Sequence, residues 1–293
     1  MKTKSFHFIL NPISGPNRNP LKIRQLIDSI FKKFSLFTYE IIETEYAGHA
    51  RILAKKCAEQ SIDCVVAIGG DGTVNEIASG LVGTNCALGI IPAGSGNGFA
   101  RNLKIPLDHK EAIEFLCHAN QTKIDSGKMN EHFFLGVAGA GFDAHISECF
   151  SKVKTRGKLP YFKLSAIEFF KYRPKLYQIK IDKNEFSIEA FLVTVANSRE
   201  YGNGALIAPK ADSKDGSLDL CIIKKFPLYY VPILIKHLFS GTIDQSKYVS
   251  YHKGTSIQIR SNNDLISHVD GEPISSSEQM DISINPKSLY VLT

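Results

Sequence analysis

The spacing of hydrophobic and polar residues changes near Lys123 and divides the chain into two parts. Before this residue, short apolar runs alternate with stretches whose apolar residues recur every three or four positions. Such alternation predicts parallel strands joined by helices. The predicted strands are 5–10, 37–43, 63–68 and 86–91, and the predicted helices are 21–34, 49–60, 74–81, 98–102 and 108–119, with Asp108 as a helix N-cap.

After Lys123, short runs of alternating apolar and polar residues predominate, which is typical of an antiparallel sandwich or barrel. The predicted strands are 132–138, 177–181, 186–196, 218–223, 256–260, 265–269, 280–284 and 288–292, with helices at 161–171 and 229–239 and a hairpin turn at 182–185. We therefore expect two domains, an α/β Rossmann-like domain over 1–124 and a β-rich sandwich over 125–293. The last strand is a candidate to return to the first domain.

Polar, glycine-rich segments follow three of the predicted strands in the first domain. They are Asn11-Pro12-Ile13-Ser14-Gly15, Gly69-Gly70-Asp71-Gly72-Thr73 and Pro92-Ala93-Gly94-Ser95-Gly96-Asn97. The carboxyl ends of the strands form the ligand-binding edge of an open α/β sheet. Glycines allow the backbone to approach a ligand, and free N–H groups suit phosphate oxygens. These loops predict a nucleotide phosphate site, although a tight turn without a ligand remains an alternative for each.

Asp71 is a carboxylate among these amides, and its expected partner is Mg²⁺, reached directly or through water, because a bare carboxylate would repel phosphate. The segment is not the dinucleotide-binding fingerprint, because Gly70-Asp71-Gly72-Thr73-Val74-Asn75 lacks its third glycine. It is not a Walker A loop either, since no Gly-Lys-Ser/Thr follows.

Composition and charge narrow the classes of partner. The chain has 293 residues and a formal net charge of +6, which suits a nucleotide, another polyanion or an anionic membrane surface. Arg/Gly-rich runs and aromatic-basic RNA motifs are absent from the sequence, so nucleic acid is not an expected partner. The six cysteines include no Cys-x-x-Cys pair and are expected to be buried, reduced thiols. With no apolar run of membrane-spanning length and no signal-peptide core at its start, the chain is expected in the cytoplasm.

Taken together, the motifs resemble those of the diacylglycerol kinase catalytic domain family, which includes bacterial lipid kinases and the sphingosine and ceramide kinases. The first domain is also distantly similar to NAD kinases and 6-phosphofructokinases. The resemblance rests on the three loops and on Asp125-x-Gly127, Asn197, Ala208-Pro209, Asp212, Asp215-Gly216 and Asp270-Gly271-Glu272. It covers almost the whole chain and implies an active site in a cleft between the two domains.

The resemblance also implies roles for individual residues. Nucleotide binding would fall to Asn11, Pro12, Ser14, Gly15, Thr44, Gly70, Asp71, Gly72, Thr73, Asn75, Glu76, Gly94, Ser95 and Asn97. Asp212, Asp215 and the carbonyl of Ser217 would bind a structural Mg²⁺. Glu272 would accept the proton, with Asp270 close by and Asp71 in the catalytic set. Ordinary Asp-Gly turn chemistry remains an alternative for both the 212–217 segment and the 270–272 segment.

The expected function is an ATP- and Mg²⁺-dependent lipid kinase that phosphorylates a hydroxyl of a diacylglycerol-like or sphingoid lipid. Its lipid substrate implies peripheral attachment at the inner membrane face, for which 161–170 and 226–235 are candidate segments, with packing on the β core as the alternative. A homodimer is a candidate assembly. Gly98 and Pro16 depart from the family pattern and bear on the choice of lipid. A kinase of a soluble metabolite such as NAD and a non-catalytic nucleotide- or lipid-binding regulator remain the alternatives.

Overall fold

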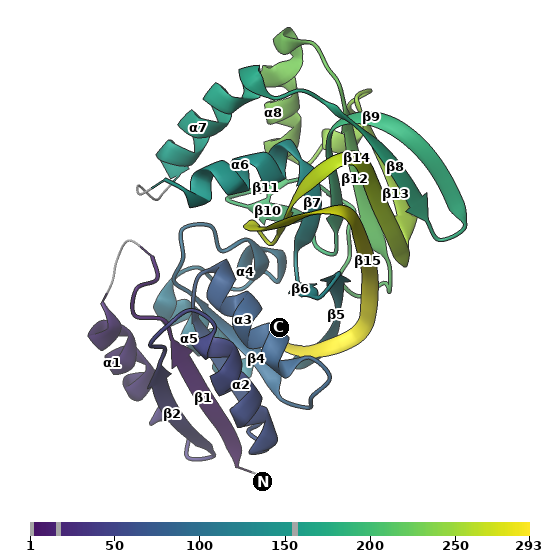
Figure 1. Cartoon of the computed structure of the whole chain (residues 1–293). Helices are drawn as coiled ribbons and strands as arrows, with labels where there is room; N and C mark the ends of the chain where they lie inside the picture. Colours follow the sequence, from purple (N-terminus) through teal and green to yellow (C-terminus); the bar gives the residue numbers. More distant parts are fainter. Residues whose placement is uncertain (1–2, 16–18, 154–157) are drawn as a thin grey trace. The chain divides into compact units, whose positions relative to one another are not determined.

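Two sets of strands and helices surround separate cores in the computed structural model, which describes residues 3–15, 19–153 and 158–293 (Figure 1). One unit consists of Met1–Ile124 and Lys287–Thr293, and the other consists of Asp125–Pro286. Two long strands, β5 and β15, contribute residues to both units. An α/β unit and a β-rich unit are both present, so the predicted fold class is confirmed.

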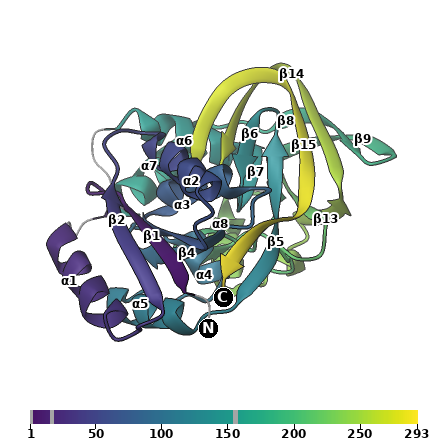
Figure 2. The ribbon, with the colours of Figure 1, turned by 90° about the horizontal axis from the view of Figure 1, so that it is seen from below.

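The N-terminal unit alternates strands and helices as predicted. Its elements are β1 (Lys4–Leu10), α1 (Pro20–Phe31), β2 (Phe37–Glu43), α2 (His49–Glu59), β3 (Cys64–Gly69), α3 (Asp71–Leu81), β4 (Ala87–Pro92), α4 (Gly98–Asn102) and α5 (His109–His118). The parallel strands run in the order β2, β1, β3, β4, and the end of β15 pairs in parallel with β4. α2 packs with α3 on one face, and α1 packs with α5 on the other (Figure 2). β3 and β4 are buried along their whole length, as parallel strands covered on both faces should be.

Two helix boundaries in this unit differ from the prediction by three residues, and one of them changes how the site is built. α1 ends at Phe31, three residues early, because Phe34 leaves the helix and stacks on Phe37, with ring centroids 5.0 Å apart. α3 begins at Asp71 and not at Val74, because the Val74 N–H already bonds to the Gly70 carbonyl at 3.1 Å. The glycine-rich segment after β3 is therefore the first turn of a helix and not a loop before it.

The C-terminal unit is built from antiparallel strand pairs covered by helices. Its elements are β5 (Gln121–Met129), β6 (His132–Phe134), β7 (Val137–Gly141), α6 (Phe142–Ser151), α7 (Lys158–Lys171), β8 (Lys175–Ile181), β9 (Asn184–Ala196), β10 (Glu200–Gly202), β11 (Ala205–Leu206), β12 (Leu218–Lys224), α8 (Val231–Ser240), β13 (Val249–Gly254), β14 (Ser256–Val269) and β15 (Glu272–Leu292), with 3-10 turns at Leu228–Tyr230 and Ile243–Gln245. The order along the main sheet is β13, β12, β9, β7, β14, β15, while β8 pairs with both β9 and β14. Its core includes Phe134, Tyr177, Ile179, Val193, Leu220 and Ile259.

Several elements of this unit differ from the prediction. The 132–138 strand is divided into β6 and β7, and the strands predicted at 256–260 and 265–269 are joined in β14, as those at 280–284 and 288–292 are in β15. The periodicity did not predict α6, β5 or β13. Four consecutive residues of β5 are buried, so it lacks the alternation that marks a half-exposed strand. α6 did carry a signal, since Phe142, Ile146 and Phe150 recur every four positions.

Candidate functional site

The predicted phosphate loops lie at the carboxyl ends of three adjacent strands, β1, β3 and β4. Close backbone contacts join them. A Cβ atom at Gly94 would lie 2.4 Å from the Gly70 Cα, and one at Gly15 would lie 2.0 Å from the Ala93 carbonyl oxygen. No side chain fits at these two contacts, so the glycines allow the loops to pack directly against one another. The structure thus brings the three motifs together in one unit.

Side chains from the same motifs hold this arrangement in place. The Asn11 side-chain amide donates to the Thr73 hydroxyl oxygen at 3.0 Å, which links the loop after β1 to the first turn of α3. The Asn97 side chain accepts from the Gly94 N–H at 2.9 Å and donates to the Gly94 carbonyl at 3.0 Å, which closes the loop after β4. Ser95, at the tip of that loop, is exposed. The side chains of Asn11 and Asn97 therefore stabilise the loops by hydrogen bonds within the protein.

The N-terminus of α3 offers donors to an anion. Its N-cap is Gly70, and no side chain among the described residues caps it. Gly72 in its first turn is exposed, with open space where a Cβ would stand. The first N–H groups of a helix have no partner within the helix and carry the positive end of its dipole. This terminus is suited to bind a phosphate group.

Two acidic side chains of α3 make contacts that the sequence did not reveal. One Asp71 carboxylate oxygen accepts from the Phe99 N–H at 3.2 Å, so this side chain also holds the start of α4. Glu76 accepts from the Gly48 N–H at 3.0 Å and holds the turn after β2, where the Thr44 N–H bonds to the Leu10 carbonyl at 2.9 Å. Gly98 is buried as the first residue of α4. Pro16 lies outside the described residues.

In the C-terminal unit, Asp270 and Gly271 form the tight turn between β14 and β15. Their φ angles are +48° and +85°, as a type I′ hairpin turn requires. The Asp270 carboxylate accepts from three successive backbone N–H groups, those of Leu135 at 2.9 Å, Gly136 at 2.8 Å and Val137 at 2.9 Å. These bonds occupy both carboxylate oxygens and explain why the predicted strand breaks between β6 and β7. Glu272, the first residue of β15, is exposed.

Buried polar residues connect this turn to the acidic loop at 212–217. Asn197 is 1% exposed, and its amide donates to the Leu135 carbonyl at 2.8 Å and to the Asp125 carbonyl at 3.0 Å. The Asp125 carboxylate in turn accepts from the Gly216 N–H at 2.8 Å. Asn197 and Asp125 belong to the family motifs, but the sequence analysis gave them no role. In the structure they join the Asp270 turn to the acidic loop.

The acidic loop offers hard oxygen ligands, as a Mg²⁺ site needs. Asp212 and Asp215 are exposed, and Asp215 accepts from the Ser217 N–H at 2.9 Å and from its hydroxyl at 2.6 Å. Lys253 forms an ion pair with Asp215 and supplies positive charge there. Asp219, which the sequence analysis did not select, has a buried carboxylate oxygen that lies 3.9 Å from the Lys253 Nζ and has no hydrogen-bond partner among the described residues. A buried carboxylate oxygen without a hydrogen-bond partner and two exposed aspartates fit a segment that binds positive charge, which Lys253 supplies here.

A further network of mostly buried polar side chains contacts the Asp270 turn through His268. One Asp143 carboxylate oxygen accepts from the Thr194 hydroxyl at 2.6 Å, the Tyr201 hydroxyl at 2.8 Å and the His268 Nε2 at 3.0 Å. The His268 Nδ1 accepts from the Gly271 N–H at 3.4 Å. Burial raises the pKa of Asp143, but His268 and the two hydroxyl groups outweigh it and hold that pKa below its usual range. Sequence reasoning missed this network because α6, which carries Asp143, was not predicted.

The cysteines are free thiols, and four of them, Cys57, Cys64, Cys86 and Cys221, are buried. Burial raises the pKa of Cys57 to about 11 and that of Cys86 to about 12. Cys117 and Cys149 are half-buried, so the prediction of buried thiols is wrong for these two. Among the described residues, no helix combines the length and the apolar character needed to span a bilayer.

Comparisons with known proteins agree with this architecture. The model of the diacylglycerol kinase catalytic domain matches residues 5–129, and that of the YegS C-terminal NAD kinase beta sandwich-like domain matches residues 136–293. Two curated relatives named diacylglycerol kinase, from Staphylococcus aureus strains JH9 and Newman, are each 31% identical over 278 residues, which cover 92% of this chain and 86% of theirs.

Solved structures share the fold along almost the whole chain. A putative diacylglycerol kinase from Bacillus anthracis strain Sterne aligns with a TM-score of 0.83 at 22% identity and covers 99% of this chain and 95% of its own. A second putative diacylglycerol kinase from the same strain aligns with a TM-score of 0.80 at 24% identity and covers 99% of this chain and 97% of its own. At these identities the likeness establishes the fold alone.

Proposed function

Because this chain belongs to the diacylglycerol kinase catalytic domain family, whose members are phosphotransferases with an alcohol group as acceptor, we propose that it transfers the γ-phosphate of ATP to a hydroxyl of a diacylglycerol-like or sphingoid lipid. The observation that carries the proposal is the direct packing of glycine loops from three adjacent strand ends beside the uncapped N-terminus of α3. Transfer of a phosphoryl group depends mainly on positioning and charge stabilisation. Backbone N–H groups held by glycine contacts are suited to both tasks.

Asp71 and the acidic loop are the proposed contacts for Mg²⁺. The exposed Asp212 and Asp215 and the carbonyl of Ser217 would hold a structural ion, while Asp71 would act on the ion that accompanies the nucleotide. When bound, Mg²⁺ neutralises charge on the phosphate oxygens. The hydrogen bond from the Phe99 N–H fixes the direction of the Asp71 carboxylate.

Glu272 is the proposed general base, and Asp270 the residue that positions it. Glu272 is exposed at the start of β15, where its carboxylate is available to accept a hydroxyl proton. Both oxygens of the Asp270 carboxylate accept hydrogen bonds from backbone N–H groups. These bonds suit a residue that anchors the turn better than one that takes part in the reaction. Together with His268 behind the turn, Asp270 would hold Glu272 in a fixed place.

Apolar side chains on α7, α8 and the turn before α8 are the proposed contact with the membrane. None of the residues of α8 is buried, and Leu228 and Tyr229 just before it are 55% and 76% exposed. On α7, Ile167 and Phe170 are exposed. Nearby lysines would attract an anionic surface while these side chains enter the headgroup region. This supports peripheral attachment of a lipid kinase.

The deciding experiment supplies γ-labelled ATP and Mg²⁺ with vesicles of total lipid extract in one arm and with soluble metabolites, including NAD, in another. We expect label in the lipid fraction. Label only in the soluble arm would refute the lipid assignment in favour of a metabolite kinase, and label in neither would favour a binding protein. Glu272→Gln should lower kcat by ~10²–10⁴-fold, whereas Glu278→Gln, an exposed glutamate on the same strand, should not.

A further inference from the structure

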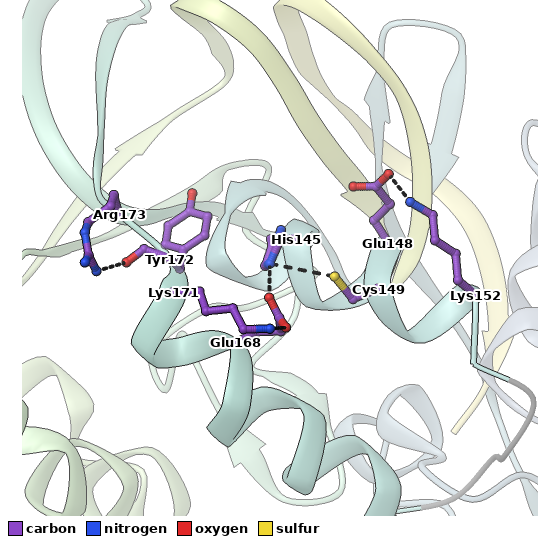
Figure 3. Close-up of polar contacts among 8 residues, drawn as sticks. All are labelled: His145, Glu148, Cys149, Lys152, Glu168, Lys171, Tyr172 and Arg173. Atoms are coloured by element: carbon purple, nitrogen blue, oxygen red, sulfur yellow. Dashed lines mark hydrogen bonds and ion pairs between the residues drawn. The ribbon is translucent and has the colours of Figure 1, made fainter.

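A polar cluster outside the proposed phosphotransfer residues lies between α6 and α7. His145 and Cys149 stand four residues apart on α6, and Glu168 comes from α7 (Figure 3). The Nε2 atom of His145 lies 2.9 Å from the Glu168 Oε2 and 3.7 Å from the Cys149 Sγ. The three ligand atoms all lie within 4.8 Å of one another. We propose that this cluster binds a borderline-soft divalent cation of the Zn²⁺ class.

The converging atoms lie close to the separations that such an ion needs. Zinc bonds of ~2.0–2.3 Å to nitrogen, oxygen and sulfur set tetrahedral ligand atoms ~3.3–3.8 Å apart. The His145–Cys149 separation of 3.7 Å already falls in that range, and the His145–Glu168 separation of 2.9 Å needs only a slight opening. A thiolate, a carboxylate and a neutral imidazole carry two negative charges together, which match a divalent ion. Two of the ligands come from one turn of a helix, whose backbone fixes their spacing.

The geometry argues against a catalytic triad, the other familiar use of these residue types. In a triad, the base contacts the nucleophile through one ring nitrogen and the orienting carboxylate through the other. Here the thiol and the carboxylate both face the same nitrogen, Nε2 of His145. Three ligand atoms that converge on one point are arranged for an ion between them and not for a relay of protons along them.

The surroundings leave the cluster partly accessible to solvent and orient the carboxylate. Lys171 contacts the other Glu168 oxygen, Oε1, at 2.7 Å, which leaves Oε2 turned toward His145. The side chains of His145 and Glu168 are 25% and 14% exposed, so an ion could enter and keep a water molecule as its fourth ligand. Glu148, also on α6, instead pairs with Lys152, and its carboxylate points away from the cluster (Figure 3). A bound ion would clamp α6 to α7.

The test is metal binding by the chelator-treated full chain, measured by competition with a chromophoric chelator and by the absorption spectrum of added Co²⁺. We expect one Zn²⁺ per chain and a thiolate-to-cobalt charge-transfer band. Cys149→Ser, His145→Gln and Glu168→Gln should each weaken binding by about a hundredfold or more, given that even loss of a residue behind the ligands costs ~10–100-fold. Glu148→Gln and Cys117→Ser, a half-buried cysteine on α5, are the matched controls and should bind as the wild type does.

Zn²⁺ should also raise the Tm of the wild type and of both controls, but not that of Cys149→Ser, because the ion stabilises only a folded chain that binds it. Wild-type affinity no higher than that of Cys149→Ser would overturn the proposal. So would a cobalt spectrum of the wild type without the charge-transfer band, a result that does not depend on the folding of any variant. Neither readout depends on kinase activity.

Discussion

Replacement of Asp270 by Asn tests whether this residue anchors the turn that carries Glu272. Asn can keep its carbonyl oxygen toward the N–H groups of Gly136 and Val137, but its amide then faces the N–H of Leu135, where the carboxylate accepts at 2.9 Å. A hydrogen bond to a charged group contributes ~1.5–3 kcal/mol, and a donor left without a partner adds to the loss. We therefore expect the local structure to be destabilised by about 2–4 kcal/mol, which corresponds to ~30- to 700-fold in the equilibrium for local opening.

Hydrogen exchange followed by mass spectrometry measures that opening directly in peptides that cover 135–137. Exchange there should accelerate in Asp270→Asn, and kcat should fall while KM for ATP stays near the wild-type value, because the nucleotide loops belong to the other unit. Asp182→Asn is a matched control. Asp182 begins another hairpin turn at positive φ and accepts from the Thr255 and Ser256 N–H groups. This control should leave both exchange at 135–137 and kcat unchanged.

Two outcomes would refute the reasoning. Unchanged exchange at 135–137 in Asp270→Asn would mean that the three hydrogen bonds do not hold this segment. Faster exchange with full kcat would mean that the segment is held as described but that the turn does not position the base. A loss of kcat without faster exchange would instead favour direct participation of Asp270 in the reaction.

Three further predictions concern other parts of the chain. Asp71→Asn should abolish phosphotransfer without changing the Tm, because Asn still accepts from the Phe99 N–H; substantial activity would remove Asp71 from the mechanism. Replacing Leu228 and Tyr229 with Ser should lower flotation with anionic vesicles by about tenfold or more at low salt. If the wild type floats equally with neutral and with anionic vesicles, the proposed attraction of its lysines to an anionic surface is contradicted. Because the folded pKa of Asp143 is lowered, its ionised form stabilises the fold above the ordinary aspartate pKa of ~3.9, and this contribution is lost as the pH falls through the folded value. Denaturant titrations should therefore show Asp143→Asn less stable by about 3 kcal/mol at pH 7, with the difference from wild type shrinking below about pH 4; a difference independent of pH would contradict this.

Local patterns predicted the bounds of several elements accurately. β2 and α4 have the predicted bounds, and Asp108 caps α5 by accepting from the Lys110 and Glu111 N–H groups. Errors arose where tertiary contacts replace local preference. β5 is buried without alternation, and the strand predicted at 132–138 is interrupted because the N–H groups of Leu135–Val137 bond to Asp270, far along the chain. No local pattern encodes such a bond.

By itself, the sequence determined the chemistry of the loops and the order of the elements, because glycine spacing and hydrophobic period are local properties that a chain carries before it folds. Only the tertiary structure decided which of these residues meet. It joins Gly70 to Gly94 and Asn197 to Asp125, and it brings His145, Cys149 and Glu168 to one point. Contacts between distant residues depend on how strands pair and helices pack, and a single sequence carries no periodic signal for them.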